Sequence, residues 1–549
     1  MEAKKTIQQA LSEALRQCGV ALESKDVPLE FPAELSHGDY ASGVALRYAK
    51  QAGVNSSELA QKIVDVIGKV SGVSKIDIAG PGFVNFHLAP ATLTRSLESA
   101  SRVDGWGVNS ELGGQKILIE YTDPNPFKEF HIGHLMANAI GESISRLVQC
   151  SGAQTKRANY QGDVGPHVAK ALWGKMQKPE LSWGQAYAFG SKEYEAHKEE
   201  IDAINARVYA RDDERINELY DAGRKESLAH FEELYKILGT KFDYYFFESE
   251  TAFRGLGLVG AHSDVFEKSD GAVVYKGEQD GLHTRVFITS KGLPTYETKE
   301  LGLAQLKDET WNSDISITIT AQEQADYFSV VLAVMRRIMP ESAAKIRHIS
   351  HGMMRLPSGK MSSRTGDVIT GESLLNDLIE QAKVRAAESR ADDHEKLAQE
   401  VAVAAIKYQI LKQASGKDIV FDRERALSLE GDSGPYLQYA HARTRAILEK
   451  AKEQGVTPDI GEYQDAALGL ARMLHRFPEV VERAASLYEP HLVTNYLLQI
   501  ASEFNSWYAQ EQILDGTPNA GHKVALTAAV AQTLKNGLWI LGIPAPEKM

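Results

Sequence analysis

Two histidines three residues apart are placed where they could bind a phosphate group. They belong to the segment H-I-G-H, His131 to His134, which follows a short apolar stretch at 116–122 and a Pro-rich loop. Residues three apart share one helix face, and the first turn of a helix attracts anions. Gly133 leaves the backbone bare, so a flat base can lie against it. Alone, such a pair is as often a metal pair or two surface histidines, but the order strand, loop, helix favours nucleotide binding.

A second segment suits a leaving pyrophosphate. It follows the Gly- and Pro-containing stretch 351–358, so we expect it on a loop. A loop lysine and arginine with two hydroxyls can close over ATP and stabilise phosphate charge. On its own a short basic loop is usually only solvated. The segment consists of Gly359, Lys360, Met361, Ser362, Ser363 and Arg364.

Together, and in this order, the two segments resemble the H-I-G-H and K-M-S-K-S signatures of class I aminoacyl-tRNA synthetases. Their surroundings resemble the arginyl enzymes in particular. E-Y-T-D-P-N-P-F-K at 120–128 is similar to that family's E-x-S-S-P-N-x-x-K, and G-D-V-G at 162–165 to its G-D-W-G. The stretches 34–42 and 80–86 resemble the family's N-terminal domain, and 428–448 and 540–549 its anticodon-binding domain. The resemblance covers nearly the whole chain.

The resemblance implies an arginine pocket made of Glu120, Asn125, Tyr296, Glu300 and Gln324. Two carboxylates and polar acceptors suit a guanidinium, which is planar and permanently charged. The family usually has Asp where Glu300 stands. For an arbitrary glutamate a surface salt bridge is the simpler interpretation, but Glu120 ends the first strand, where α/β sheets bind ligands.

The resemblance also implies the reaction. Arginine attacks the α-phosphate of ATP, pyrophosphate leaves, and the terminal adenosine of tRNA(Arg) takes the arginyl group; tRNA is needed even for the first step. Mg²⁺ is expected to accompany ATP, with no dedicated protein metal site. The second signature departs from the family, since it reads K-M-S-S-R. The implied ATP-binding and catalytic residues are Lys128, His131, Gly133, His134, Lys360, Met361, Ser362, Ser363 and Arg364.

Further residues are implied for the tRNA. In the family the segment that contains Phe83 and Asn85 reads the tRNA elbow. Aromatic side chains that stack on unpaired bases are the usual means of binding RNA loops, although tyrosines in a helical domain are also common core residues. The candidates for the anticodon arm are Tyr436, Gln438, Tyr439, Tyr508 and Met549.

The elements that position these residues form three predicted domains. Residues 1–108 read as α+β, with two strands around a Gly-Pro-Gly turn and a Gly-rich linker at 101–115. Residues 109–380 read as a Rossmann-like α/β domain with a helical insertion at about 174–255. A strand at 286–290, a helix from about Lys299 and a strand at 314–320 continue it. Residues 381–549 show helical periodicity and predict an all-α bundle.

Length and composition limit the number of domains and the classes of protein to consider. A chain of 549 residues is expected to form two to four domains. The net charge of −13 neither suggests nor excludes RNA, because binding depends on local patches. Two cysteines give neither a four-cysteine zinc site nor a disulfide framework. The first residues do not read as a signal peptide and no apolar run of membrane length is present, so we expect a cytoplasmic enzyme. We also expect a monomer.

Three alternatives stay open at this point. One is a class I synthetase for another amino acid, such as lysine or cysteine, which would need a different pocket. The second is a small HxGH-type nucleotidyltransferase, which the chain length disfavours. The third is a non-catalytic tRNA-binding paralogue, which has no need of the two histidines or Lys360.

Overall fold

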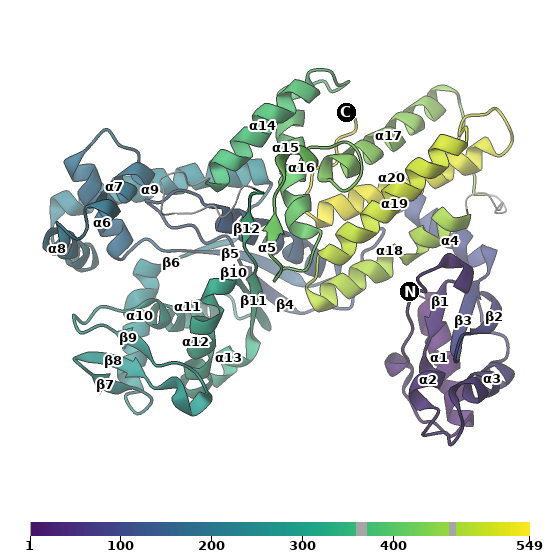
Figure 1. Cartoon of the computed structure of the whole chain (residues 1–549), viewed down its shortest axis with the longest axis horizontal. Helices are drawn as coiled ribbons and strands as arrows, with labels where there is room; N and C mark the ends of the chain where they lie inside the picture. The colour runs from purple at the N-terminus through teal and green to yellow at the C-terminus, as the bar shows by residue number, and fades with distance from the viewer. Residues whose placement is uncertain (1, 358–369, 461–467) are drawn as a thin grey trace.

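A computed structural model describes residues 2–357, 370–460 and 468–549. The predicted motif Lys360–Arg364 lies outside the described residues. Figure 1 shows an N-terminal domain, a central sheet with helices around it, and a C-terminal bundle of helices. Among the described residues no helix combines the length and apolarity needed to cross a bilayer.

The N-terminal domain has a core of its own, as predicted. A three-stranded antiparallel sheet in the order β1-β3-β2 packs on helices. The Gly-Pro-Gly turn joins the second strand to the third. Its elements are α1 (Glu2–Gln17), η1 (Ser24–Asp26), η2 (Leu35–His37), β1 (Tyr40–Ser42), α2 (Val44–Tyr48), α3 (Ser56–Ile67), β2 (Val73–Ala79), β3 (Phe83–Leu88) and α4 (Pro90–Arg102).

The central sheet confirms the predicted Rossmann-like fold. Within the described residues it has five parallel strands in the order β11-β10-β4-β5-β6. The chain order reverses between β4 and β10, which is where such sheets bind ligands, at the carboxyl ends. The strands are β4 (Lys116–Glu120), β5 (Gln154–Gln161), β6 (Tyr244–Phe247), β10 (Ile315–Ala321) and β11 (Ile346–His351).

Helices cover both faces of this sheet. The first, α5, crosses β4 closely: a Cβ on Gly141 would lie 2.1 Å from the Tyr121 ring, so only glycine fits there. The remaining elements of this part are α5 (Ile132–Cys150), α6 (Pro166–Gln177), α7 (Trp183–Lys192), α8 (Lys198–Ala210), α9 (Glu214–Leu238), α10 (Glu248–Ala261), η3 (Gly277–Asp280), α11 (Tyr296–Thr310), η4 (Gln322–Gln324), α12 (Ala325–Ile338) and α13 (Pro340–Lys345).

Two details of the central part differ from the prediction. The predicted helical insertion, about 174–255, contains β6, which is a strand of the main sheet. The predicted strand at 286–290 corresponds to β9 (Arg285–Ile288), which pairs in a separate antiparallel sheet with β7 (Glu267–Ser269) and β8 (Ala272–Tyr275). Residue pattern indicates a strand but does not say which strand it pairs with.

The C-terminal part is helical, as predicted, and it shares one core with α5. The predicted boundary at 380 falls inside α14, because that helix is continuous and packs on α15. Its elements are β12 (Met354–Arg355), α14 (Gly371–Ala386), α15 (His394–Leu411), β13 (Ile419–Val420), α16 (Arg423–Ala426), α17 (Gly434–Glu453), α18 (Leu468–Leu487), α19 (His491–Gln510) and α20 (Ala520–Ile540). The N-terminal domain lies against α18, where Asp39 and Arg472 form an ion pair at 2.5 Å (Figure 1).

A buried cluster of charges joins α5 to β4 and β5. Glu142 on α5 accepts hydrogen bonds from Arg146 Nε at 2.7 Å, Arg157 Nε at 3.1 Å and the Tyr121 hydroxyl at 2.5 Å. Burial acts to raise the pKa of Glu142, but Arg146 and Arg157 outweigh it, so the pKa is lowered. The carboxylate is therefore ionised and fully paired.

Substitution Glu142→Gln should lower the free energy of unfolding by about 3–5 kcal/mol, because it leaves buried arginines without their counter-charge. Denaturant titration at neutral pH measures the loss. The folded-state pKa is lowered, so the carboxylate stabilises the fold above its unfolded pKa and the difference between the proteins should shrink in acid. Glu98→Gln, which removes an exposed partner of Arg102, is the control and should change stability by less than about 0.5 kcal/mol. An equal loss of stability in Glu142→Gln and Glu98→Gln would contradict a stabilising role of the Glu142 charge cluster.

Candidate active site

The loop after β4 carries unusual backbone geometry. Thr122, Asp123 and Phe127 have positive φ angles of 81°, 46° and 70°. Such angles cost energy in non-glycine residues and cluster at functional sites. The surrounding protein holds them: Asp123 accepts from the Tyr160 backbone N–H at 2.7 Å, and the Phe127 ring packs on Trp183, with ring centroids 5.2 Å apart. The loop is thus locked at the switch point of the sheet.

Acidic side chains gather beside this loop. Glu120 is 2% exposed and its Oε2 lies 2.6 Å from Lys307 Nζ. Burial and the charge of Glu120 raise the pKa of Asp123 well above its usual range. Burial and the charge of Glu120 also raise the pKa of the half-buried Glu300, to about 8, although Lys307 acts to lower it. The cluster has more carboxylates than cations and is suited to receive one further cation.

A second ion pair lines the adjoining wall. Lys299 Nζ lies 2.6 Å from Glu248 Oε2, and both side chains are 5% exposed. The same Nζ lies 5.2 Å from the centre of the Tyr296 ring, which is 55% exposed at the start of α11. Asn125 Oδ1 lies where a Cβ on Gly162 would be, 2.2 Å from it, so that glycine makes room for the amide.

The structure brings four of the five predicted pocket residues to this end of the sheet. Glu120, Asn125, Tyr296 and Glu300 belong to or adjoin the acidic cluster and its wall. The fifth, Gln324, is exposed in η4, which directly follows β10. Tyr327, one turn further, was not predicted: burial and the charge of Glu300 raise its pKa well above the usual range.

The predicted histidines meet at the start of α5. Their rings stack with centroids 3.4 Å apart, and the His131 backbone N–H donates to His134 Nδ1 at 3.2 Å. Burial and neighbouring positive groups such as Lys128 lower the pKa of both, that of His131 to about 4. Neutral His134 therefore carries its proton on Nε2, where it can donate to a ligand. A Cβ on Gly133 would lie 3.0 Å from the His131 ring.

Lys128 lies close to these rings. Its Nζ is 4.9 Å from the centre of the Tyr187 ring, and its charge contributes to the lowered pKa of His131, His134 and the buried His167. Positive charge and neutral ring N–H groups thus occur together beside the acidic pocket. This arrangement suits phosphate oxygens next to a cationic group.

The start of α14 and the end of β11 lie beside the two histidines. The Gly371 N–H donates to the Phe130 carbonyl at 2.8 Å, directly before His131. His351, at the carboxyl end of β11, contributes to the lowered pKa of His131 and His134 and so also lies near them. Gly371 and His351 therefore both lie beside the predicted pair of histidines.

The residues predicted for the anticodon arm divide into two groups. Tyr439 and Tyr508 both face Arg443, with 4.7 and 5.4 Å between its guanidinium carbon and their ring centres. Tyr436 is linked to them through Asn505. The Asn505 side-chain N–H donates to the Tyr436 hydroxyl, and the Asn505 amide oxygen accepts from Arg443. Gln438 points elsewhere: it is fully buried and donates to the carbonyls of Glu400 and Pro544.

Three remaining predicted tRNA residues have mixed exposure. Met549 packs partly buried on the main core. Phe83 is half-buried on β3, whereas Asn85 is 2% exposed. A base can reach the Asn85 amide only after its neighbours move, and the contact of both residues with the tRNA elbow stays a prediction.

Several site residues escaped the sequence analysis: Asp123, Lys307, Tyr327, His351 and Arg443. Only Asp123 had a local signal, its place in the Pro-rich loop. The others come from separate elements and meet through the fold. No group of three or more His, Cys, Asp or Glu side chains in the described ranges is arranged to hold a metal ion.

The chain matches three protein families in order. Residues 2–88 match the family described as "Arginyl tRNA synthetase N terminal domain", residues 104–423 "tRNA synthetases class I (R), catalytic domain", and residues 437–549 "DALR anticodon binding domain". The chain is 30% identical to the arginine–tRNA ligase of Limosilactobacillus reuteri, and the match covers 100% of both. It is 29% identical to that of Parabacteroides distasonis over 85% of this chain and 86% of the relative.

Solved structures agree. The arginyl-tRNA synthetase of Thermus thermophilus has a TM-score of 0.83 at 25% identity, with 100% of each chain covered. The arginyl-tRNA synthetase of Plasmodium falciparum has a TM-score of 0.79 at 20% identity, covering 100% of this chain and 99% of that one, and supports the fold alone.

Proposed function

This chain belongs to the arginyl-tRNA synthetase family, and on that premise we propose how its site attaches arginine to tRNA with ATP. The observation that supports this most is the acidic cluster at the switch point. Glu120, Asp123 and Glu300 face one described lysine, Lys307. A guanidinium stays charged at any relevant pH, so burying it requires compensating carboxylates. Asn125, Tyr296 and Gln324 complete the proposed pocket.

The proposed first step joins arginine to AMP. A carboxylate oxygen of arginine attacks the α-phosphorus of ATP, and the bond to the β-phosphate breaks. His134 Nε2–H, His131 and Lys128 would stabilise charge on the phosphate oxygens, with Lys360 and Arg364 acting on the pyrophosphate. Gly133 would admit the base, and Met361, Ser362 and Ser363 are proposed to act with Lys360 on bound ATP. The tRNA terminal hydroxyl then attacks the arginyl carbonyl, and AMP leaves.

Magnesium would enter with ATP. It supplies charge neutralisation on the phosphates and prefers oxygen ligands. The phosphate end of the described site presents histidines and Lys128, which do not form a cage for this ion. We therefore propose that Mg²⁺ is held by ATP oxygens and water.

We also propose that the protein is a cytoplasmic monomer, because all of the proposed site residues come from one chain.

A charging assay tests the proposed function. The protein is incubated with total tRNA, ATP and radiolabelled arginine, and acid-precipitable label is counted. We expect ATP-dependent labelling that competes with unlabelled arginine and not with lysine. No labelling with intact, folded protein would reject the proposal in favour of the non-catalytic alternative.

Arginine binding should strengthen as the pH rises from about 6 to above 8. Glu300, with its pKa raised to about 8, holds a proton in the empty pocket below that pH, and arginine favours the ionised form. Affinity should therefore rise by up to about tenfold per pH unit below pH 8 and level off above it, with proton release on binding. Calorimetry in buffers of different ionisation enthalpy measures both. Glu300→Gln should flatten the curve; a flat curve for the wild type would contradict this role.

The tyrosines around Arg443 should contribute to tRNA binding. The double variant Tyr439→Ala/Tyr508→Ala should raise the tRNA KM about tenfold or more, because base stacking contributes roughly 1–3 kcal/mol per base. The arginine Kd should not change. Phe253→Ala, which removes an exposed aromatic ring from α10 on the far side of the molecule, serves as the control (Figure 1). An unchanged tRNA KM in the double variant would assign these rings to packing.

A further inference from the structure

We propose that Lys307 is a positioning residue of the arginine pocket, which holds one oxygen of Glu120 and leaves the other to meet the guanidinium. This inference rests on the proposed function. It adds a residue that touches neither arginine nor ATP and acts through Glu120.

Among the described residues Lys307 forms one ion pair, although its charge also acts on Asp123 and Glu300. Its Nζ lies 2.6 Å from Glu120 Oε2, and the two side chains are 10% and 2% exposed. The nearest competing carboxylate on the same helix, Asp308, is taken, since it accepts from Ser342 and from Lys345 at 3.1 Å. In the described part of the chain no other ion pair of Lys307 occurs. Glu120 Oε2 makes no hydrogen bond in the described part of the chain, so charge attraction to Lys307 is what acts on this oxygen.

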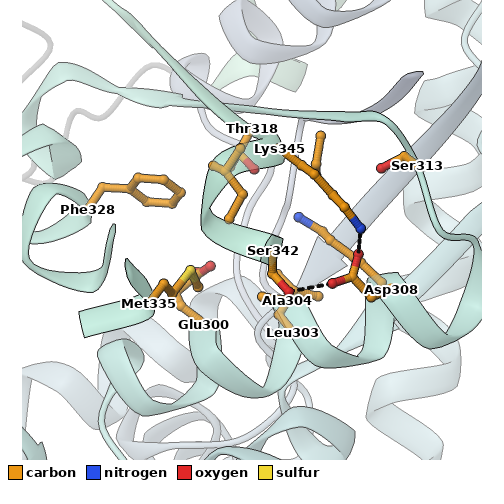
Figure 2. A pocket seen from close by; sticks show the side chains of 13 residues that line it. Glu300, Leu303, Ala304, Asp308, Ser313, Thr318, Phe328, Met335, Ser342 and Lys345 are labelled. Atoms are coloured by element: carbon orange, nitrogen blue, oxygen red, sulfur yellow. Dashed lines mark hydrogen bonds and ion pairs between the residues drawn. The ribbon is translucent and has the colours of Figure 1, made fainter. Parts of the chain in front are cut away.

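The spacing on α11 brings Lys307 into the same pocket as Glu300. The two residues are seven positions apart, which is two helical turns, so they share one face. Both line a narrow cavity of about 20 Å³ between α11, β10, α12 and α13. Figure 2 shows Glu300 with Met335 and Phe328 at one end of this cavity and Asp308, Ser342 and Lys345 at the other. Lys307 and Glu300 therefore share the wall of one cavity.

Charge gives this contact a function. Glu120 and Asp123 at the end of β4 and Glu300 on α11 would be three carboxylates without a cation if Lys307 were absent. Glu248 on α10, Glu297 on α11 and Tyr327 on α12 also face the group, and Lys299 is already paired with Glu248. Crowded carboxylates keep protons, and a protonated acid donates where a guanidinium needs an acceptor. Lys307 acts to lower the pKa of Asp123 and of Glu300, so it opposes their protonation while arginine is absent.

The test compares Lys307→Met with Lys307→Arg. The arginine Kd is measured by calorimetry between pH 6 and 9, and the ATP Kd beside it. Lys307→Met should weaken arginine binding about tenfold at pH 7. The rise of affinity with pH should also shift to a higher pH by about one unit, because carboxylates of the cluster must lose their protons before arginine binds. Lys307→Arg should keep the position of the curve. ATP affinity should be unchanged in both. Lys345→Met removes a lysine of the same cavity that does not touch Glu120, and should behave like the wild type.

An unmoved curve in Lys307→Met would overturn the inference. Tighter arginine binding in that variant would also overturn it, because Lys307 would then compete with the substrate. If Lys307→Met is too unstable to measure, Lys307→Gln makes the same comparison with a polar side chain. Failure of the wild type itself to bind arginine would instead reject the proposed function.

Discussion

Glu120→Gln is expected to weaken arginine binding by roughly 10²–10³-fold while ATP binding stays within about twofold. The substitution keeps the size of the side chain but removes its charge and turns one acceptor into a donor. Loss of one partner of a buried charged pair costs about 3–5 kcal/mol. Two cations would lose their partner here, the guanidinium and Lys307, which lies 2.6 Å away. Calorimetric titration of each ligand measures the split.

Glu309→Gln is the matched control for this experiment. Glu309 belongs to the same helix as Glu300 but is exposed, in an ion pair with Arg254. This substitution should leave the affinities for arginine and for ATP unchanged. Citrulline, which is neutral, should bind the wild type poorly for the same reason. Equal weakening of arginine and ATP in Glu120→Gln would mean that Glu120 only supports the structure.

His134→Asn should slow arginine activation by about 10²–10³-fold, the usual contribution of one donor to a developing oxyanion. Asparagine can still accept from the His131 N–H, as His134 Nδ1 does at 3.2 Å, but it has no group at the position of Nε2. Single-turnover formation of the adenylate measures the rate. His134→Gln places an amide N–H near Nε2 and should recover part of the activity. Because burial keeps the pKa of His134 low, the loss should be the same at pH 6 and pH 8.

Equal rates for His134→Gln and His134→Asn would contradict donation from Nε2. A fall in arginine affinity without a change in rate would place His134 in the amino-acid pocket instead.

Local pattern was sufficient for some elements and not for others. The strand at β4 was predicted because a short apolar stretch precedes a Pro-rich loop, and its residues Ile117 to Ile119 are indeed fully buried. The helix α5 was predicted from the helical pattern that follows this loop. The strand β6 was missed, since Tyr244–Phe247 is a short run between two long helical patterns, separated from the first by only the segment 239–243. The boundary at 380 was placed inside α14 because one helix packs on both the catalytic part and the bundle.

The site was predictable to the extent that one segment carries it. Glu120, Asn125 and the histidines lie within fifteen residues, so the family resemblance placed them together. Lys307 and Tyr327 belong to α11 and α12, and their proximity to Glu120 depends on the reversal of strand order at the switch point. Gln438 illustrates the opposite case: it lies in a segment predicted to bind RNA, but its amide donates to two backbone carbonyls. Composition does not distinguish such a residue from its neighbours.

The most direct test of the central claim is amino-acid-dependent exchange of pyrophosphate into ATP. It is run with all twenty amino acids and citrulline, with and without tRNA. The account predicts exchange with arginine in the presence of tRNA, none above background with lysine or citrulline, and loss of the arginine signal in Glu120→Gln. Exchange driven by another amino acid, or an arginine signal that survives Glu120→Gln unchanged, would contradict it.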